Sequence, residues 1–191
     1  PLHVQYWDWI TDVVRGDLGE SIMTGHRVSD LILSNFPSTV RLTVAGMTIA
    51  VIIGLSLGII AAVNHNTWLD NIFMLISVSG VAMPSFWLGL VLIFIFSVKL
   101  RWLSITGGTR LERLVLPSVA LGFQASAVIA RLVRSNLLEA MTQDYIRTAR
   151  SKGLSERIVI VRHALQNSLI PVVTIVGLQF GWLLGGATII E

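Results

Sequence analysis

Four long apolar runs alternate with shorter polar segments along the chain. The run from Ser38 to Val63 contains a single charge, Arg41, near its start. About 20 apolar residues in an α-helix cross a bilayer core, so this run predicts a spanning helix. The same criterion predicts three further spans, at Asn71–Val98, Leu114–Val133 and Ser168–Ile190.

The second predicted span is interrupted by the residues Ala82-Met83-Pro84-Ser85. A proline inside a helix removes a backbone donor and bends the helix, so we expect a kink at Pro84, either static or moving with a transport cycle. The first and fourth spans are rich in glycine, which favours close helix packing over the lining of a path. These glycines are Gly54, Gly58, Gly181 and Gly185.

The segments outside the spans differ in character. Residues 1–37 mix polar and apolar positions in a pattern that indicates a short amphipathic helix. We expect them to form an extracytoplasmic N-terminal segment, followed by a transmembrane domain at 38–191. Residues 64–70 are expected to form a polar turn, and 99–113 a loop around Gly107-Gly108.

The segment 135–167 is polar and basic, although apolar runs flank it on both sides. Thr142 is the predicted N-cap of a helix with Asp144 in its first turn. Gly153 stands where a glycine commonly ends a helix. The pattern therefore predicts a short helix that stops at this glycine.

A second short helix is predicted after the glycine, with Ser155 as its N-cap and Glu156 in its first turn. The two helices would meet at an elbow. Three of its residues are expected to face one partner: Ile146, Ala149 and Leu154. Two simpler interpretations stay open: a solvated linker whose arginines only set topology, or a basic helix that lies on anionic lipid.

Basic residues are distributed unevenly between the two sides of the predicted bundle. The side that holds 64–70 and 135–167 carries Arg131, Arg134 and the five basic residues of the elbow. The other side carries six Lys and Arg over a longer total length. Short loops rich in Lys and Arg stay in the cytoplasm, so we place 135–167 there. Nothing in the chain would then export its first residues, so we expect the chain to be the middle of a larger membrane protein.

Composition agrees with a membrane solvent. Of the 191 residues, 53% are hydrophobic and 13% are charged, against roughly 25% charged in soluble domains. The chain has no cysteine, which excludes disulfides, cysteine-ligated zinc, iron–sulfur clusters and thiol catalysis. Its four histidines lack metal-ligand spacing, and it has no GxxxxGK[ST] sequence for ATP. We therefore predict no catalytic residue, no metal site and no cofactor bound by this chain.

Polar residues inside the spans mark a candidate path, because polar groups at bilayer depth commonly face the bundle interior or water. Hydrogen bonding between helices is an equally favoured alternative. The candidate path residues are these polar positions, Gln124, Ser126 and Gln179, together with the interruption of the second span at Met83, Pro84 and Ser85.

The elbow resembles the EAA loop of bacterial ABC importer permeases, whose pattern is Glu-Ala-Ala, three residues, Gly, nine residues and Ile-x-Leu-Pro. With Gly153 on the family glycine, Ala149 and Leu165 match. Arg147 replaces the acid, and the proline follows only at Pro171.

These departures resemble one branch, the permeases of dipeptide, oligopeptide, nickel and glutathione importers. The stretch YIRTARSKGLSERIVIVRH at 145–163 is similar to the loop of that branch. So are Arg15–Ser21, the Pro37-x-Thr39-x-x-Leu42 entry to the first span, and Met83–Trp87. The resemblance covers nearly the whole chain.

The resemblance implies an all-α, polytopic transmembrane helical bundle with the type I ABC importer fold, in the bacterial plasma (inner) membrane. Four spans would lie in this chain and six in the full protein. The elbow would be the coupling helix that docks in a cleft of an ATPase subunit. The coupling residues implied are Tyr145, Arg147, Thr148, Ala149, Arg150, Lys152, Gly153, Leu154 and Ser155.

The resemblance also implies the partners. These are a second, related permease subunit, two cytoplasmic ATPase subunits that hold ATP and Mg, and an extracytoplasmic substrate-binding protein. This chain would form a path for peptides, or for a related solute such as a nickel complex or glutathione. The alternatives are a secondary transporter or channel, and a membrane adaptor that recruits a soluble protein. The predicted spans contain no acid, which disfavours an ion-coupled carrier.

Overall fold

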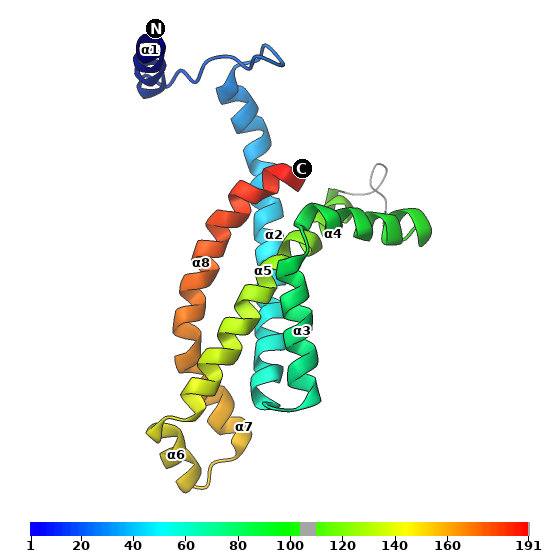
Figure 1. Ribbon diagram of the computed structural model, residues 1–191, viewed down its shortest axis with the longest axis vertical. Helices are drawn as coiled ribbons and strands as arrows, with labels where there is room; N and C mark the ends of the chain where they lie inside the picture. Colours follow the sequence, from blue (N-terminus) through cyan, green and yellow to red (C-terminus); the bar gives the residue numbers. More distant parts are fainter. Residues whose placement is uncertain (104–109, 191) are drawn as a thin grey trace. The chain divides into compact units, whose positions relative to one another are not determined.

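Helices make up most of the computed structural model, which describes residues 1–103 and 110–190 (Figure 1). The described residues contain no strand, only an isolated bridge between Glu20 and Arg27. The chain divides into two compact units, Pro1–Arg41 and Leu42–Glu191. The loop predicted around Gly107-Gly108 lies outside the described residues.

In the first unit, helix α1 (Leu2–Val14) is the predicted amphipathic helix. None of its residues is buried, and Trp7 and Trp9 are more than half exposed. Two glycines with positive φ, Gly19 and Gly25, allow the turns that follow. These turns lead to the start of helix α2.

Helix α2 (Val28–Val63) begins ten residues before the predicted first span and continues through Pro37. The prediction placed its start where the apolar run starts. Helical backbone bonds do not require a continuous apolar run, and residues 28–37, which are mostly exposed and mix polar with apolar side chains, extend the same helix.

The predicted second span is not one helix. It is divided into α3 (Trp68–Ala82) and α4 (Ser85–Leu92), and α4 continues as the π-helical η1 (Ile93–Lys99). The two halves meet at 105°, so the expected kink is a break. Met83 and Pro84 both have extended backbones, because the residue before a proline is disfavoured in the α region and proline lacks the N–H that would continue the helix.

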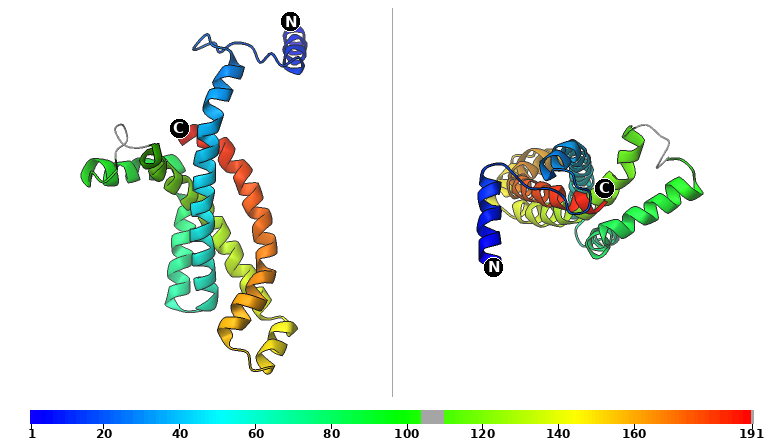
Figure 2. Two further views of the ribbon diagram at one scale, coloured as in Figure 1. Left: turned by 180° about the vertical axis from the view of Figure 1, so that it is seen from behind. Right: turned by 90° about the horizontal axis from the view of Figure 1, so that it is seen from above.

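Helices α5 (Arg110–Met141) and α8 (Leu165–Ile190) correspond to the third and fourth predicted spans. Both are longer than predicted, and residues 135–141 belong to α5 rather than to the polar segment. Figures 1 and 2 show α5 between α3 on one side and α8 on the other. The second unit has its main core here, made by Leu42, Met47, Ala50, Leu121, Ala125, Ile129, Val133, Val172 and Leu183.

Glycines bring α2 and α5 into close contact. A Cβ added at Gly54 would stand 2.7 Å from Ile129, and one at Gly58 would stand 2.6 Å from the Ala130 carbonyl oxygen. The predicted close packing of the first span is confirmed. At Gly181 and Gly185 of α8 an added Cβ would meet no atom within 4 Å, so the described contacts do not include the predicted close packing of the fourth span.

Within residues 1–103 and 110–190, three helical stretches are long and apolar enough to cross a membrane: Val28–Val63, Glu112–Met141 and Glu156–Gly185. The broken pair α3–η1 makes a fourth if its halves count as one span. The predicted class, an all-α polytopic helical bundle, is confirmed.

Candidate functional site

The elbow at residues 143–165 has the predicted order of helix, glycine and helix. Helix α6 (Asp144–Ser151) is followed by Lys152 at its C-cap and then by Gly153, whose φ of +74° lies in the left-handed region that favours glycine. The N–H of Gly153 donates to the Arg150 carbonyl oxygen at 2.9 Å. The chain therefore turns at Gly153, the residue at which the sequence predicted that the helix would stop.

The second half of the elbow is not an isolated helix. Helix α7 (Glu156–Ile158) continues as the π-helical η2 (Val159–Ala164), which runs into α8. No glycine or proline stands between Glu156 and Leu165, so nothing in the sequence stops the helix there. The elbow is thus joined to a spanning helix at each end, directly to α8 and through residues 142–143 to α5.

The predicted caps differ in the structure. Gln143, not Thr142, occupies the N-cap of α6. Because α5 continues to Met141, the Thr142 hydroxyl instead donates back to the Glu139 carbonyl oxygen at 2.7 Å. Ser155 does occupy the N-cap of α7, but its side chain makes no capping hydrogen bond.

One face of α6 is buried against the chain itself. Ile146 is 0% exposed and Ala149 is 6% exposed. They belong to a second core cluster, formed by Ala62, Leu137, Ala140, Ile146, Ala149, Val159 and Ala164. The expectation that Ile146 and Ala149 face a partner is therefore wrong: their spacing of three places them on the inner face of α6, which packs on α5 and η2.

The other face of the elbow is exposed and basic. The exposed members of the predicted coupling set are Tyr145, Arg147, Thr148, Arg150, Lys152, Gly153, Leu154 and Ser155. Arg150 donates to both carboxylate oxygens of Glu156, at 2.7 Å and 3.3 Å. This carboxylate raises the pKa of the Arg150 guanidinium, and the pair ties the two arms of the elbow together.

A crevice of about 240 Å³ opens beside the elbow, between the end of α5, the start of α6 and the start of α8. Its lining mixes polar and apolar residues and includes one predicted coupling residue, Tyr145. The lining residues are Asn136, Glu139, Ala140, Gln143, Tyr145, Asn167, Ser168 and Pro171.

A larger cavity, of about 600 Å³, lies where the break between α3 and α4 faces α5 and α8. Four of the six candidate path residues line it, namely Pro84, Ser85, Gln124 and Gln179. The other residues of the lining are apolar or aromatic: Val81, Phe86, Leu121, Ala125, Val128, Trp182 and Leu183. None of these described lining residues is charged.

The other two candidate path residues, Met83 and Ser126, are not among the residues that line the cavity. Ser126 is 1% exposed, and its hydroxyl donates to the Phe123 carbonyl oxygen at 2.7 Å. It lies at the close contact with α2, beside Gly54. The Ser126 hydroxyl therefore bonds within its own helix, and neither a place on the cavity wall nor the alternative of a hydrogen bond between helices describes it.

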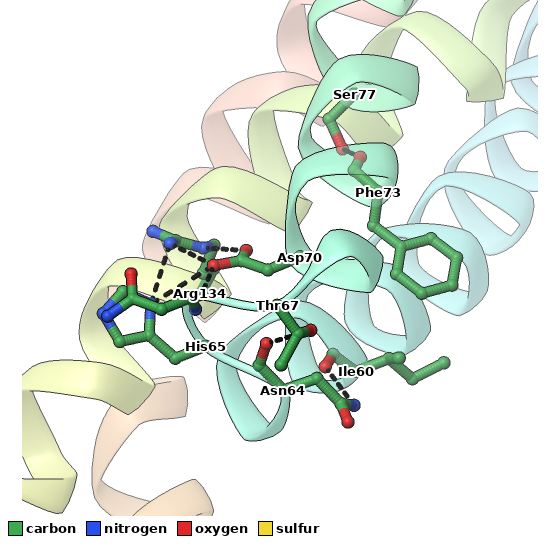
Figure 3. A network of polar contacts seen from close by, with 9 residues as sticks. Ile60, Asn64, His65, Thr67, Asp70, Phe73, Ser77 and Arg134 are labelled. Atoms are coloured by element: carbon green, nitrogen blue, oxygen red, sulfur yellow. Dashed lines mark hydrogen bonds and ion pairs between the residues drawn. The ribbon is translucent and has the colours of Figure 1, made fainter.

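A partly buried ion pair, absent from the sequence predictions, joins α3 to α5 (Figure 3). Arg134 Nε donates to Asp70 Oδ1 at 2.6 Å, and Arg134 Nη2 donates to Asp70 Oδ2 at 2.7 Å. Asp70 is only 3% exposed. It also accepts the backbone N–H of Asn66 at 3.1 Å, and His65 Nδ1 lies 3.2 Å from Oδ2.

Sequence reasoning placed Asp70 in a polar turn and Arg134 at the end of a span, where each looked like an ordinary boundary charge. The one signal in the sequence that could have indicated their pairing is that Asp70 and Arg134 each lie directly beside an apolar run. Among the described residues, no group of three or more His, Cys, Asp or Glu is placed to hold a metal ion.

Comparison with known proteins gives concordant matches. Residues 54–191 match the family described as binding-protein-dependent transport system inner membrane component. All 191 residues align, at 47% identity, with the glutathione transport system permease protein GsiC of Escherichia coli O6:H1. The proteins of the same name from Escherichia coli K12 and Salmonella choleraesuis are 47% and 46% identical. The chain spans 62% of the length of these curated relatives.

Proposed function

Because the chain belongs to the family of binding-protein-dependent transport system inner membrane components, we propose that it is a permease subunit of an ABC importer. As a member of this family with several apolar helices, it is a multi-pass inner-membrane protein. The proposed partners are two ATPase subunits that hold ATP and Mg, a substrate-binding protein, and a second related permease subunit. ATP hydrolysis belongs to the ATPase subunits and not to this chain.

The observation that carries the proposal is the elbow. Its inner face, with Ile146 and Ala149, is packed on the chain's own helices, so a force applied to its outer face is passed to α5 and α8. The outer face presents basic side chains at Arg147 and Lys152. A docking cleft on an ATPase would need carboxylates or carbonyl oxygens opposite them.

The cavity is the proposed part of the translocation path in this chain. Its volume lies within the roughly 300–1,000 Å³ of typical ligand sites. Gln124 and Gln179 offer both donors and acceptors, which suits the amide groups of a peptide. The relatives named for glutathione transport support a solute of this class, and glutathione itself is a peptide. A nickel complex is the competing solute.

The alternative of an ion-coupled carrier is less well supported. Such carriers place ionisable groups at the site where the solute binds. The described lining of the cavity has no charge, and the buried acid Asp70 is already paired with Arg134. A membrane adaptor would have no use for the cavity.

The test uses the complete transporter, purified through a tag on this chain and reconstituted in liposomes. Arg147→Glu combined with Lys152→Glu reverses the charge of the elbow's outer face. We expect the ATPase subunits to be lost from the purified complex and the uptake of labelled glutathione and of a labelled dipeptide to fall. Arg15→Glu, an exposed charge reversal in the first unit, is the control and should change neither.

Intact ATPase binding together with intact uptake in the elbow variant would refute the coupling role. Uptake of a nickel complex, with neither glutathione nor the dipeptide transported by the unaltered complex, would refute the proposed solute class.

A further inference from the structure

The ion pair between Asp70 and Arg134 occupies a position between the elbow and the cavity. Arg134 lies on α5, seven residues before the helix ends at Met141. Asp70 lies in the first turn of α3, whose far end is the break at Met83 and Pro84. The pair therefore connects the helix that carries the elbow to the helix that ends at the cavity.

The elbow is joined to the helix of Arg134 by buried apolar side chains. Leu137 and Ala140, on the same helix as Arg134, are buried with Ile146 and Ala149 of α6 in the second core cluster. Leu137 follows Arg134 by three residues, less than one helical turn. A displacement of α6 therefore moves the segment of α5 that holds the guanidinium.

The connection from Asp70 to the cavity is a single short helix. Helix α3 has 15 residues, and its last turn contributes Val81 to the cavity wall, followed by Pro84, Ser85 and Phe86 after the break. Near this end, Gly80 packs closely on α5: an added Cβ would stand 3.2 Å from Ala127 and from Phe123. Helix α3 is thus attached to α5 at two points, polar at one end and closely packed at the other.

The chemistry of the polar attachment differs from that of the packing around it. Two parallel hydrogen bonds between a guanidinium and a carboxylate fix both the distance and the relative rotation of the groups. Apolar surfaces in contact can slide, because dispersion attraction has little directional preference. From the turn between α2 and α3, the Asn66 N–H donates to the same carboxylate, and His65 Nδ1 lies within 3.2 Å of both Asp70 Oδ2 and Arg134 Nη2 (Figure 3). The Asp70 side chain is therefore oriented from both sides.

We propose that Asp70 and Arg134 are positioning residues that transmit movement of the elbow through α3 to the wall of the cavity. This inference rests on the proposed function, since it requires that the elbow be moved by an ATPase. With the pair intact, α3 follows α5 as one body, and the wall at 81–86 changes place when the elbow does. With the pair removed, the elbow and α5 move while α3 can lag behind.

A role in folding alone makes a different prediction. Removal of one partner leaves a buried unpaired charge, which is destabilising, whereas replacement of both partners by apolar residues of similar size often is not. If the pair serves only stability, replacing both residues restores every property of the transporter. If it transmits movement, replacing both restores stability and leaves transport poorly coupled to hydrolysis.

The experiment measures solute taken up per ATP hydrolysed by the complete transporter in liposomes, with labelled glutathione and a labelled dipeptide as probes. The thermal midpoint of the purified complex is measured in parallel. The variants are Asp70→Asn, Arg134→Lys, and the double replacement Asp70→Leu with Arg134→Met. Arg131→Gln, an exposed arginine one turn earlier on α5, is the matched control.

We expect the ratio of uptake to hydrolysis to fall about threefold or more in all three test variants, and to stay unchanged in the control. Arg134→Lys keeps the charge but loses the two-pronged contact, so it tests the geometry even if Asp70→Asn assembles poorly. In the double variant the midpoint should return toward that of the unaltered complex while the ratio stays low.

A normal ratio in the double variant or in Arg134→Lys would overturn the inference. Its failure is distinguishable from a failure of the proposed function. If Arg147→Glu with Lys152→Glu abolishes uptake while Arg134→Lys leaves the ratio normal, only the transmitting role is refuted. If the elbow variant has no effect on uptake or ATPase binding, both are refuted.

Discussion

Gly54 of α2 lies so close to Ile129 of α5 that a Cβ on the glycine would stand 2.7 Å from both the Cβ and the Cγ2 of the isoleucine. Carbon atoms in contact prefer a separation of about 3.5–4.0 Å. The Ser126 carbonyl oxygen would stand 2.9 Å from the same Cβ. Because a carbonyl oxygen belongs to the backbone, it cannot turn aside, and the position admits only glycine at the present helix separation.

Gly54→Ala should therefore destabilise the protein. Overpacking of a close contact costs about 1–3 kcal/mol, and we expect a lower thermal midpoint of the detergent-solubilised protein. Gly177→Ala in α8 is the control, since an added Cβ there meets no atom within 4 Å. Equal midpoints for the two variants would mean that α2 and α5 separate without cost.

Substitutions at Gly153 should be ranked by backbone conformation rather than by size. Its φ is +74°, yet an added Cβ would meet no atom within 4 Å. The left-handed region costs most L-residues roughly 1–2 kcal/mol, and asparagine less. We expect Gly153→Val to loosen the end of α6, measured as faster amide hydrogen exchange in residues 149–153, and Gly153→Asn to change it little. Similar exchange in both variants would show that the turn is not held in this conformation.

Glu156→Gln should open the elbow to proteases. The carboxylate holds Arg150 through two hydrogen bonds across the Gly153 turn. Without it, we expect faster trypsin cleavage at Lys152 and Arg157, and the unaltered protein should approach the same rate at high salt, because salt screens exposed charges. Glu139→Gln, on the neighbouring α5, is the control. A cleavage rate in Glu156→Gln that matches the control at low salt would contradict this role of the pair.

Gln124→Leu and Ser126→Ala should differ in transport, although the residues are two positions apart. Gln124 lines the cavity, whereas Ser126 is buried and bonded to its own helix. Loss of one hydrogen bond to a passing solute, worth about 1 kcal/mol, corresponds to roughly a fivefold lower uptake rate for Gln124→Leu. Ser126→Ala should transport normally. Normal uptake by Gln124→Leu, or equal losses in the two variants, would place the path elsewhere.

Local patterns in the sequence were sufficient to predict the spanning helices and the elbow. A long apolar run leaves few alternatives to a membrane helix, and Gly153 follows a helix in a position that few other residues tolerate. The close contacts at Gly54 and Gly58 were predicted for the same kind of reason, because only a missing side chain allows them.

Properties that depend on residues far apart in the chain were not predictable in this way. Asp70 and Arg134 are separated by 64 residues, and no local pattern pairs them. Ala149 was expected to face a partner, but the packing of α6 on the rest of the chain decides which face is covered. The angle of the break at Pro84 likewise depends on what α4 packs against, and a proline alone specifies only that the helix cannot continue unchanged.

The break between α3 and α4 also has a consequence for water. The last carbonyl groups of α3 and the first N–H groups of α4 lack helical partners, and they lie next to the cavity. Within a bilayer such groups must be satisfied by protein or by water. The cavity should therefore stay hydrated even though most of its side chains are apolar. A solute that enters it would exchange its hydrogen bonds with bulk water for hydrogen bonds with these backbone groups and with the water in the cavity, and would not be transferred into an apolar medium.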